Sequence, residues 1–112
     1  MVRQHVVQFL LLDKKYPKSH INVEKVLKVN GLRKRYDVVV YNSDGAIAIL
    51  IECKASEIKI AQTTFDQIAR YNMTLNAQFL MVTNGLNHYF CKMDFKNEKY
   101  EFLKELPEYS GL

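Results

Sequence analysis

Residues 35–54 read RYDVVVYNSDGAIAILIECK, in which two runs rich in β-branched residues flank the dipeptide Asp44-Gly45. Asp-Gly suits the positive φ angles of a tight hairpin turn, so the stretch predicts two antiparallel strands joined at that turn. Side chains alternate between the two faces of a strand, and this parity predicts that the hairpin brings Asp37 next to Glu52 and Lys54. The stretch therefore predicts the middle of a sheet and, at one point on it, two carboxylates and an ammonium group.

The whole chain has the size and composition of one folded domain. It contains 112 residues, of which 48% are hydrophobic and 25% charged. This length and balance are ordinary for a globular domain. We expect a single domain over residues 1–112, with residues 106–112 as a flexible tail.

Neither a membrane segment nor a leader is predicted. No apolar run approaches the roughly 20 residues that a membrane span needs. The first apolar stretch is interrupted by Asp13-Lys14-Lys15, unlike the core of a signal peptide, so we expect a cytoplasmic protein with no membrane partner. Cys53 and Cys91 lack the paired spacing of a disulfide framework or a zinc site. The formal charge of +4 is compatible with a polyanionic partner without requiring one.

Hydrophobic periodicity predicts the order of the remaining elements. The expected elements are a helix over residues 2–13, a strand over 21–29, a hairpin turn at Asn30-Gly31, the two strands of 35–54, a helix over about 61–77, and strands over 78–83, 88–92 and 100–103. A helix between two strands is the crossover that lets them run parallel. The expected fold class is therefore α/β, with a mixed β-sheet that contains an antiparallel three-stranded meander and is flanked by helices.

Charged residues at the end of the apolar run 46–51 require an explanation. Burying Glu52 and Lys54 at the end of a central strand is costly unless they bind an ion or each other. Two convergent carboxylates suit a hard cation such as Mg²⁺, and a lysine beside it can orient a water or stabilise negative charge on a phosphate. The alternative is a cross-strand ion pair that contributes only about 0.2–1 kcal/mol to the sheet. The residues alone leave both interpretations open.

The motifs Tyr36-Asp37, Glu52-Cys53-Lys54 and Gln67-Ile68-Ala69-Arg70-Tyr71 occur in an order that narrows the choice. This set resembles the PD-(D/E)xK nuclease superfamily, and more narrowly the N-terminal nuclease domain of type I restriction enzyme R (HsdR) subunits. The resemblance extends from near the N-terminus to about residue 92. It implies a restriction-endonuclease-like core and a Mg²⁺-dependent DNA endonuclease of the restriction-modification type, with Mn²⁺ able to substitute.

The resemblance also implies roles for individual residues. Asp37 and Glu52 would coordinate the metal together with the backbone carbonyl of Cys53, and Lys54 would position the attacking water. Gln67 and Tyr71 match a Gln-x-x-x-Tyr motif that lies beside the active site and assists DNA engagement or cleavage. Without the motif order, this pair would be an ordinary polar helix face.

Two departures from the family pattern affect the metal site. Tyr36 stands where the superfamily's name has proline, a position that is not a ligand. Relatives commonly carry an acid on the first helix, just upstream of the Val2-Arg3-Gln4 segment, and Gln4 and Gln8 cannot replace it. Glu24 is the remaining candidate for a third carboxylate, or else an exposed strand residue.

Basic residues precede Asp37 and suggest the partner. Arg33, Lys34 and Arg35 are candidates for phosphate contacts, which position a nucleic acid rather than read its sequence. The alternative is a solvated, charged turn.

Further partners are implied in turn. The resemblance implies DNA as a partner, and also other restriction-modification subunits or a separate motor domain. No Gly-rich phosphate loop with a following lysine occurs in the chain, so an ATP-driven motor would have to come from such a partner. Cutting both strands with one site per chain favours a homodimer. Two other functions remain open: a catalytically inactive nucleic-acid-binding or assembly domain of the same fold, and a domain whose acid–base cluster only stabilises its sheet.

Overall fold

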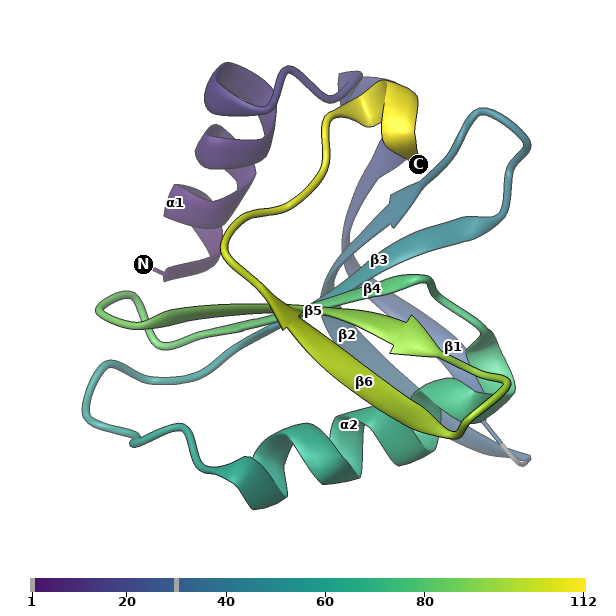
Figure 1. The fold of residues 1–112 in the computed structure, drawn as a ribbon. Helices are drawn as coiled ribbons and strands as arrows, with labels where there is room; N and C mark the ends of the chain where they lie inside the picture. Colours follow the sequence, from purple (N-terminus) through teal and green to yellow (C-terminus); the bar gives the residue numbers. More distant parts are fainter. Residues whose placement is uncertain (1, 30) are drawn as a thin grey trace.

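The computed structural model describes residues 2–29 and 31–112, which form one six-stranded sheet between two helices (Figure 1). Helix α1 covers one face of the sheet and α2 covers the other. The helices and strands are α1 (Val2–Gln8), β1 (Ile21–Val29), β2 (Leu32–Tyr41), β3 (Ile47–Cys53), α2 (Gln62–Leu75), β4 (Phe79–Thr83), β5 (His88–Asp94) and β6 (Lys99–Leu103). None of the helices in this described part of the chain is long and apolar enough to cross a membrane.

The strands lie in the sheet in their sequence order, β1 to β6. Strands β1, β2 and β3 form an antiparallel meander, and β4, β5 and β6 form a second antiparallel set. Strands β3 and β4 run parallel because α2 crosses between them. The predicted α/β class, mixed sheet and three-stranded meander are therefore confirmed.

Two hydrophobic cores lie on the two faces of this sheet. Val38, Val40 and Ile49 pack on the α1 side, whereas Val39 and Leu50 pack on the α2 side. Side chains alternate along a strand, so covering both faces buries every residue from 48 to 51. This is why the apolar run of β3 is nearly continuous and why β3 is a central strand.

The predicted hairpin turn at Asp44-Gly45 is present. The side chain of Asn42 accepts hydrogen bonds from the backbone N–H groups of Asp44 and Ala46, each at 3.0 Å. Gly45 has a φ of 81°, which glycine adopts at little cost. In the other predicted turn, Asn30 lies outside the described residues, and β1 and β2 pair up to Val29 and Leu32 on either side of it.

The first predicted helix, over residues 2–13, changes its winding partway. Residues Phe9–Asp13 form a π-helical turn, closed by the backbone N–H of Lys14 donating to the carbonyl of Phe9 at 3.1 Å. Within this segment Leu10 is fully buried against the sheet.

Residues 106–112, expected to form a flexible tail, pack against the α1 side of the sheet in this structure. Leu106 is fully buried in the core on the α1 side. The Lys14 ammonium donates to the Leu106 carbonyl, and the Tyr16 hydroxyl donates to the Pro107 carbonyl at 2.5 Å. Tyr109 begins a short 3₁₀ turn, and its hydroxyl lies 2.9 Å from Nδ1 of His20. The segment packs because its apolar side chains join this core and two of its carbonyls accept hydrogen bonds from Lys14 and Tyr16.

Candidate functional site

The candidate residues lie where β3 ends beside β2 and β4. Val38 pairs with Ile51, so Asp37 and Glu52 follow as the next residues on the two neighbouring strands. Cys53 pairs with Thr83, and the backbone N–H of Lys54 donates to the Thr83 carbonyl at 2.7 Å. This bond continues the ladder one residue beyond β3 and fixes the backbone from which Lys54 projects.

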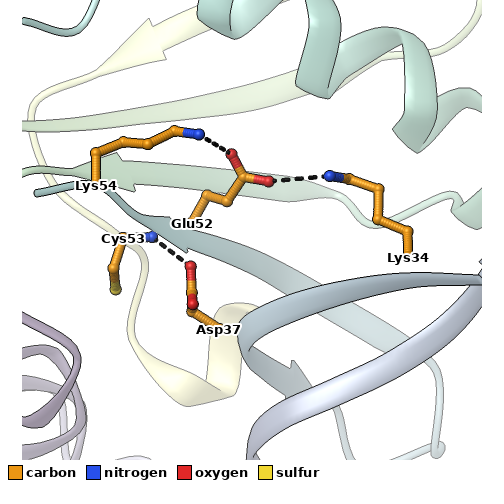
Figure 2. Close-up of polar contacts among 5 residues, drawn as sticks. All are labelled: Lys34, Asp37, Glu52, Cys53 and Lys54. Atoms are coloured by element: carbon orange, nitrogen blue, oxygen red, sulfur yellow. Dashed lines mark hydrogen bonds and ion pairs between the residues drawn. The ribbon is translucent and has the colours of Figure 1, made fainter. Parts of the chain in front are cut away.

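Glu52 is held between two lysine side chains (Figure 2). Its Oε2 lies 3.1 Å from Nζ of Lys54, and its Oε1 lies 3.3 Å from Nζ of Lys34. The Glu52 side chain is only 12% exposed, so both charge-assisted contacts form where water screens them weakly. The expected meeting of Glu52 with Lys54 is confirmed, and the contact with Lys34 is additional.

Asp37 contacts the same strand end through a different group. Its Oδ2 accepts a hydrogen bond from the backbone N–H of Cys53 at 2.7 Å. Figure 2 shows the Asp37 carboxylate directed at this backbone, while the Glu52 carboxylate is directed at the two lysines. The structure therefore brings Asp37, Glu52, Cys53 and Lys54 to one end of two strands, with the two carboxylates engaged by separate donors.

Strict alternation fails around Asp37. Tyr36 packs in the core on the α2 side and Val38 in the core on the α1 side, although residues two positions apart on a regular strand share a face. On the partner strand, Val23 pairs with Val38 and Lys25 with Tyr36, which leaves Glu24 opposite Asp37. Glu24 has a φ of 52°, a left-handed conformation that is uncommon for a residue other than glycine. The irregular backbone lies at Glu24 and Asp37, so face parity alone does not place the Asp37 side chain.

Glu24, the candidate third carboxylate, is paired with an arginine of α1. Its Oε1 accepts a hydrogen bond from Arg3 Nη1, and its side chain is 53% exposed. Within the described residues, no three acidic, histidine or cysteine side chains gather closely enough to hold a metal ion. Glu24 thus lies opposite Asp37 in register, half exposed and neutralised by Arg3.

The Cys53 side chain is not suited to bind a hard cation. Burial raises the pKa of the Cys53 thiol to about 12, and the negative charge of Asp37 adds to this effect. The thiol therefore stays protonated at neutral pH. Any ligand that Cys53 supplies is its backbone carbonyl, as the resemblance implied.

Helix α2 reaches the site through Tyr71. The Lys34 ammonium lies 5.1 Å from the centre of the Tyr71 ring and 5.3 Å from that of Tyr36. Tyr36 is only 1% exposed, and its hydroxyl makes no hydrogen bond within the described part of the chain. Burial raises the Tyr36 pKa to about 12, and the nearby charge of Glu52 contributes. Sequence reasoning missed both this role of Tyr36 and the contact between Lys34 and Glu52. Residues 34 and 36 are two apart on one strand and so share a face, and this was the sequence signal that could have placed Lys34 beside Tyr36.

The other predicted DNA-contacting residues are on the surface. Gln67 is exposed on α2, one turn before the half-buried Tyr71. Arg33 and Arg35 are exposed, and Lys34 between them is half-buried against the site. The basic run predicted as one group is therefore divided between the surface and the site.

The donor set is compatible with magnesium. Mg²⁺ prefers oxygen ligands and is commonly held by one or two carboxylates while it keeps several waters. Asp37, Glu52 and the Cys53 carbonyl supply such oxygens at one end of β2 and β3. At Glu52 a metal would compete with the two lysine contacts.

Comparison with known proteins agrees with this fold. The family model described as type I restriction enzyme R protein N terminus matches residues 1–107. A solved fragment described as an HsdR subunit of a type I restriction enzyme from Vibrio vulnificus YJ016 is similar, with a TM-score of 0.62 and 20% sequence identity. The match covers 96% of this chain and 23% of that chain. No curated protein matches. The fold implied by the resemblance is confirmed.

Proposed function

The chain belongs to the family of type I restriction enzyme R protein N termini, and we propose that it is a Mg²⁺-dependent DNA endonuclease domain of the PD-(D/E)xK type that acts in restriction-modification. The observation that carries this proposal is the contact of Glu52 with Lys54 at the end of a central strand, beside Asp37. An acid and a lysine with one residue between them project together from a strand end whose backbone the sheet holds rigid. This is a suitable arrangement for hydrolysing a phosphodiester.

Asp37, Glu52 and the Cys53 carbonyl would hold the metal, with Mn²⁺ able to replace Mg²⁺. When bound, such an ion polarises the phosphate and lowers the pKa of water. The chain's own contribution is positional. Lys54, fixed by its backbone bond to Thr83, would hold the water that attacks phosphorus and balance the negative charge that develops on the phosphate oxygens. Asp37, tied to the Cys53 N–H, keeps the two strand ends in register.

DNA would approach over the side of the sheet that carries α2. Gln67 is exposed and lies one helical turn from Tyr71, whose ring lies beside Lys34, the partner of Glu52. Arg33 and Arg35 alternate with Lys34 along β2 and so belong to its opposite face, from which they would contact phosphates that reach around the strand and position the duplex without reading its sequence. The formal net charge of +4 is consistent with such a partner.

The remaining partners belong to the same proposal. The chain spans 23% of the solved fragment that it matches, so translocation and target recognition would fall to other restriction-modification subunits or a separate motor domain. Two copies on one duplex, a homodimer, would cut both strands. The expected compartment is the cytoplasm.

Nicking of supercoiled plasmid tests the proposal. The protein is incubated with the plasmid in Mg²⁺, in Mn²⁺ and in excess chelator, and the relaxed form is quantified over time. We expect metal-dependent nicking that is lost in Glu52→Ala and Lys54→Ala proteins whose circular dichroism matches the wild type. Glu101→Ala and Lys92→Ala are matched controls, because these residues are exposed and paired across β5 and β6. Nicking by Glu52→Ala and Lys54→Ala at the rate of the wild type and of the two control variants would refute the assigned site.

A second candidate function is nucleic-acid binding without turnover. The observation in its favour is that both Glu52 oxygens contact lysines, so the charge of this carboxylate is already balanced without a metal in this conformation. Persistent DNA binding in a gel-shift assay, with no cleavage in any metal and no metal bound in a titration, would support this alternative against the endonuclease.

A further inference from the structure

Lys34 is the site residue whose position the proposed function does not explain. We propose that Lys34 is a built-in counter-ion of Glu52 that competes with the metal, so that a divalent cation binds only by displacing the Lys34 ammonium from Oε1. This inference rests on the proposed function in one respect, that Glu52 is a metal ligand. It assigns Lys34 a regulatory role in metal binding in place of a simple phosphate contact.

The first argument is electrostatic. Each Glu52 oxygen has an ammonium partner, at 3.3 Å for Lys34 and 3.1 Å for Lys54, and the carboxylate is only 12% exposed. A Mg²⁺ ligand oxygen lies about 2.0–2.1 Å from the metal. A divalent cation and an ammonium group that share one oxygen repel each other strongly where water is scarce. The withdrawal of one of the two lysines therefore favours metal binding by Glu52.

The second argument selects Lys34 as the group that moves. Besides its contact with Glu52, its ammonium lies 5.3 Å from the centre of the Tyr36 ring and 5.1 Å from that of Tyr71. A cation within about 6 Å of a ring centre keeps a favourable interaction with the ring face. Lys34 can thus leave Oε1 and retain two attractive partners, which lowers the free energy of its displacement.

The third argument concerns the surroundings of Lys34. Tyr36 is nearly fully buried, so its ring is a fixed platform, and Tyr71 is carried by α2. The Tyr36 hydroxyl is also buried without a hydrogen-bond partner among the described residues. The tyrosine whose ring lies nearest to the Lys34 ammonium from β2 therefore carries an unused polar group, as expected of a site in which hydrogen-bond partners change.

Calorimetric titration with Mn²⁺ alone tests this inference. The proteins compared are the wild type, Lys34→Met, Lys34→Arg and Lys25→Met. Methionine keeps the length of the side chain and can pack between the rings, and arginine keeps the charge. Lys25 is exposed and pairs with Tyr36 on the neighbouring strand, so its replacement removes the same charge without touching Glu52.

We expect Lys34→Met to bind Mn²⁺ about threefold to tenfold more tightly than the wild type, which is the scale of one ion pair that no longer has to be broken. Lys34→Arg should bind like the wild type, and Lys25→Met should gain less than twofold, the part that comes from general repulsion. Binding by Lys34→Met that is equal to or weaker than that of the wild type overturns the inference, as does an equal gain in Lys25→Met. If no variant binds Mn²⁺, the assignment of Glu52 as a metal ligand fails as well, and this outcome is distinct from the others.

Discussion

Two buried tyrosines allow the same chemical change to be made with opposite expected results. Tyr36 and Tyr16 are 1% and 2% exposed, so each hydroxyl is removed from bulk water in the folded protein. The Tyr16 hydroxyl donates to the Pro107 carbonyl at 2.5 Å, whereas the Tyr36 hydroxyl has no partner among the described residues. Replacement by phenylalanine removes only the oxygen in both cases and leaves the ring in place.

The magnitudes follow from the cost of leaving a buried polar group unpaired, about 1–3 kcal/mol. Tyr36→Phe removes such a group, so we expect the free energy of unfolding to rise by about 1 kcal/mol. Tyr16→Phe creates one, because the Pro107 carbonyl loses its donor, so we expect a loss of about 1–2 kcal/mol. The two variants should therefore differ by about 2–3 kcal/mol in stability.

Urea denaturation followed by circular dichroism measures this difference. With a slope of about 1.5 kcal/mol per molar urea, typical of a small domain, the unfolding midpoints of the two variants should lie about 1–2 M apart. The wild type should fall between them, with an unchanged slope. A Tyr36→Phe midpoint below that of the wild type would contradict the reasoning, because it would mean that the Tyr36 hydroxyl forms a stabilising hydrogen bond.

Three other predictions concern pH, the C-terminal segment and the Cys53 thiol. Burial raises the pKa values of Tyr16 and Tyr36 from 10.0 to about 12, because it disfavours their ionised forms, so folding stability is unaffected by their ionisation below about pH 10 and falls as the pH rises towards 12. Urea midpoints should fall over that range, and should fall less in Tyr36→Phe. Leu106→Ala should reduce the unfolding free energy by about 2–5 kcal/mol, because Leu106 is fully buried, whereas Leu86→Ala at a 75% exposed position should change it by less than about 0.5 kcal/mol. Alkylation of Cys53 at neutral pH should be much slower in the folded than in the urea-unfolded protein, since burial raises its pKa to about 12, and equal rates would contradict this environment.

The fold could be predicted largely from local patterns. Alternation and an Asp-Gly turn define the hairpin of β2 and β3, and the helix between β3 and β4 requires a parallel pair. These features depend on residues close in sequence. The register then follows, and it carries Glu52 and Lys54 to the same strand end.

The parts that could not be predicted depend on contacts between distant residues. Whether Lys34 reaches Glu52 depends on the joint placement of β2, β3 and α2, and in the sequence it is one member of a uniform basic run. The left-handed backbone of Glu24 has no signal in the residue type. Leu106 is an isolated apolar residue near Pro107, and only the completed core on the α1 side provides the space that it fills.

The role of Glu52 is tested most directly by the nicking rate of supercoiled plasmid in Mg²⁺, compared between the wild type and Glu52→Gln. Glutamine keeps the shape of the side chain and removes the charge that would bind the metal. We predict a loss of at least about a hundredfold, the scale of removing a key electrostatic group from a catalytic site, with an unchanged fold. A Glu52→Gln protein that nicks plasmid at the wild-type rate would contradict the assignment of a metal-dependent nuclease site to this strand end.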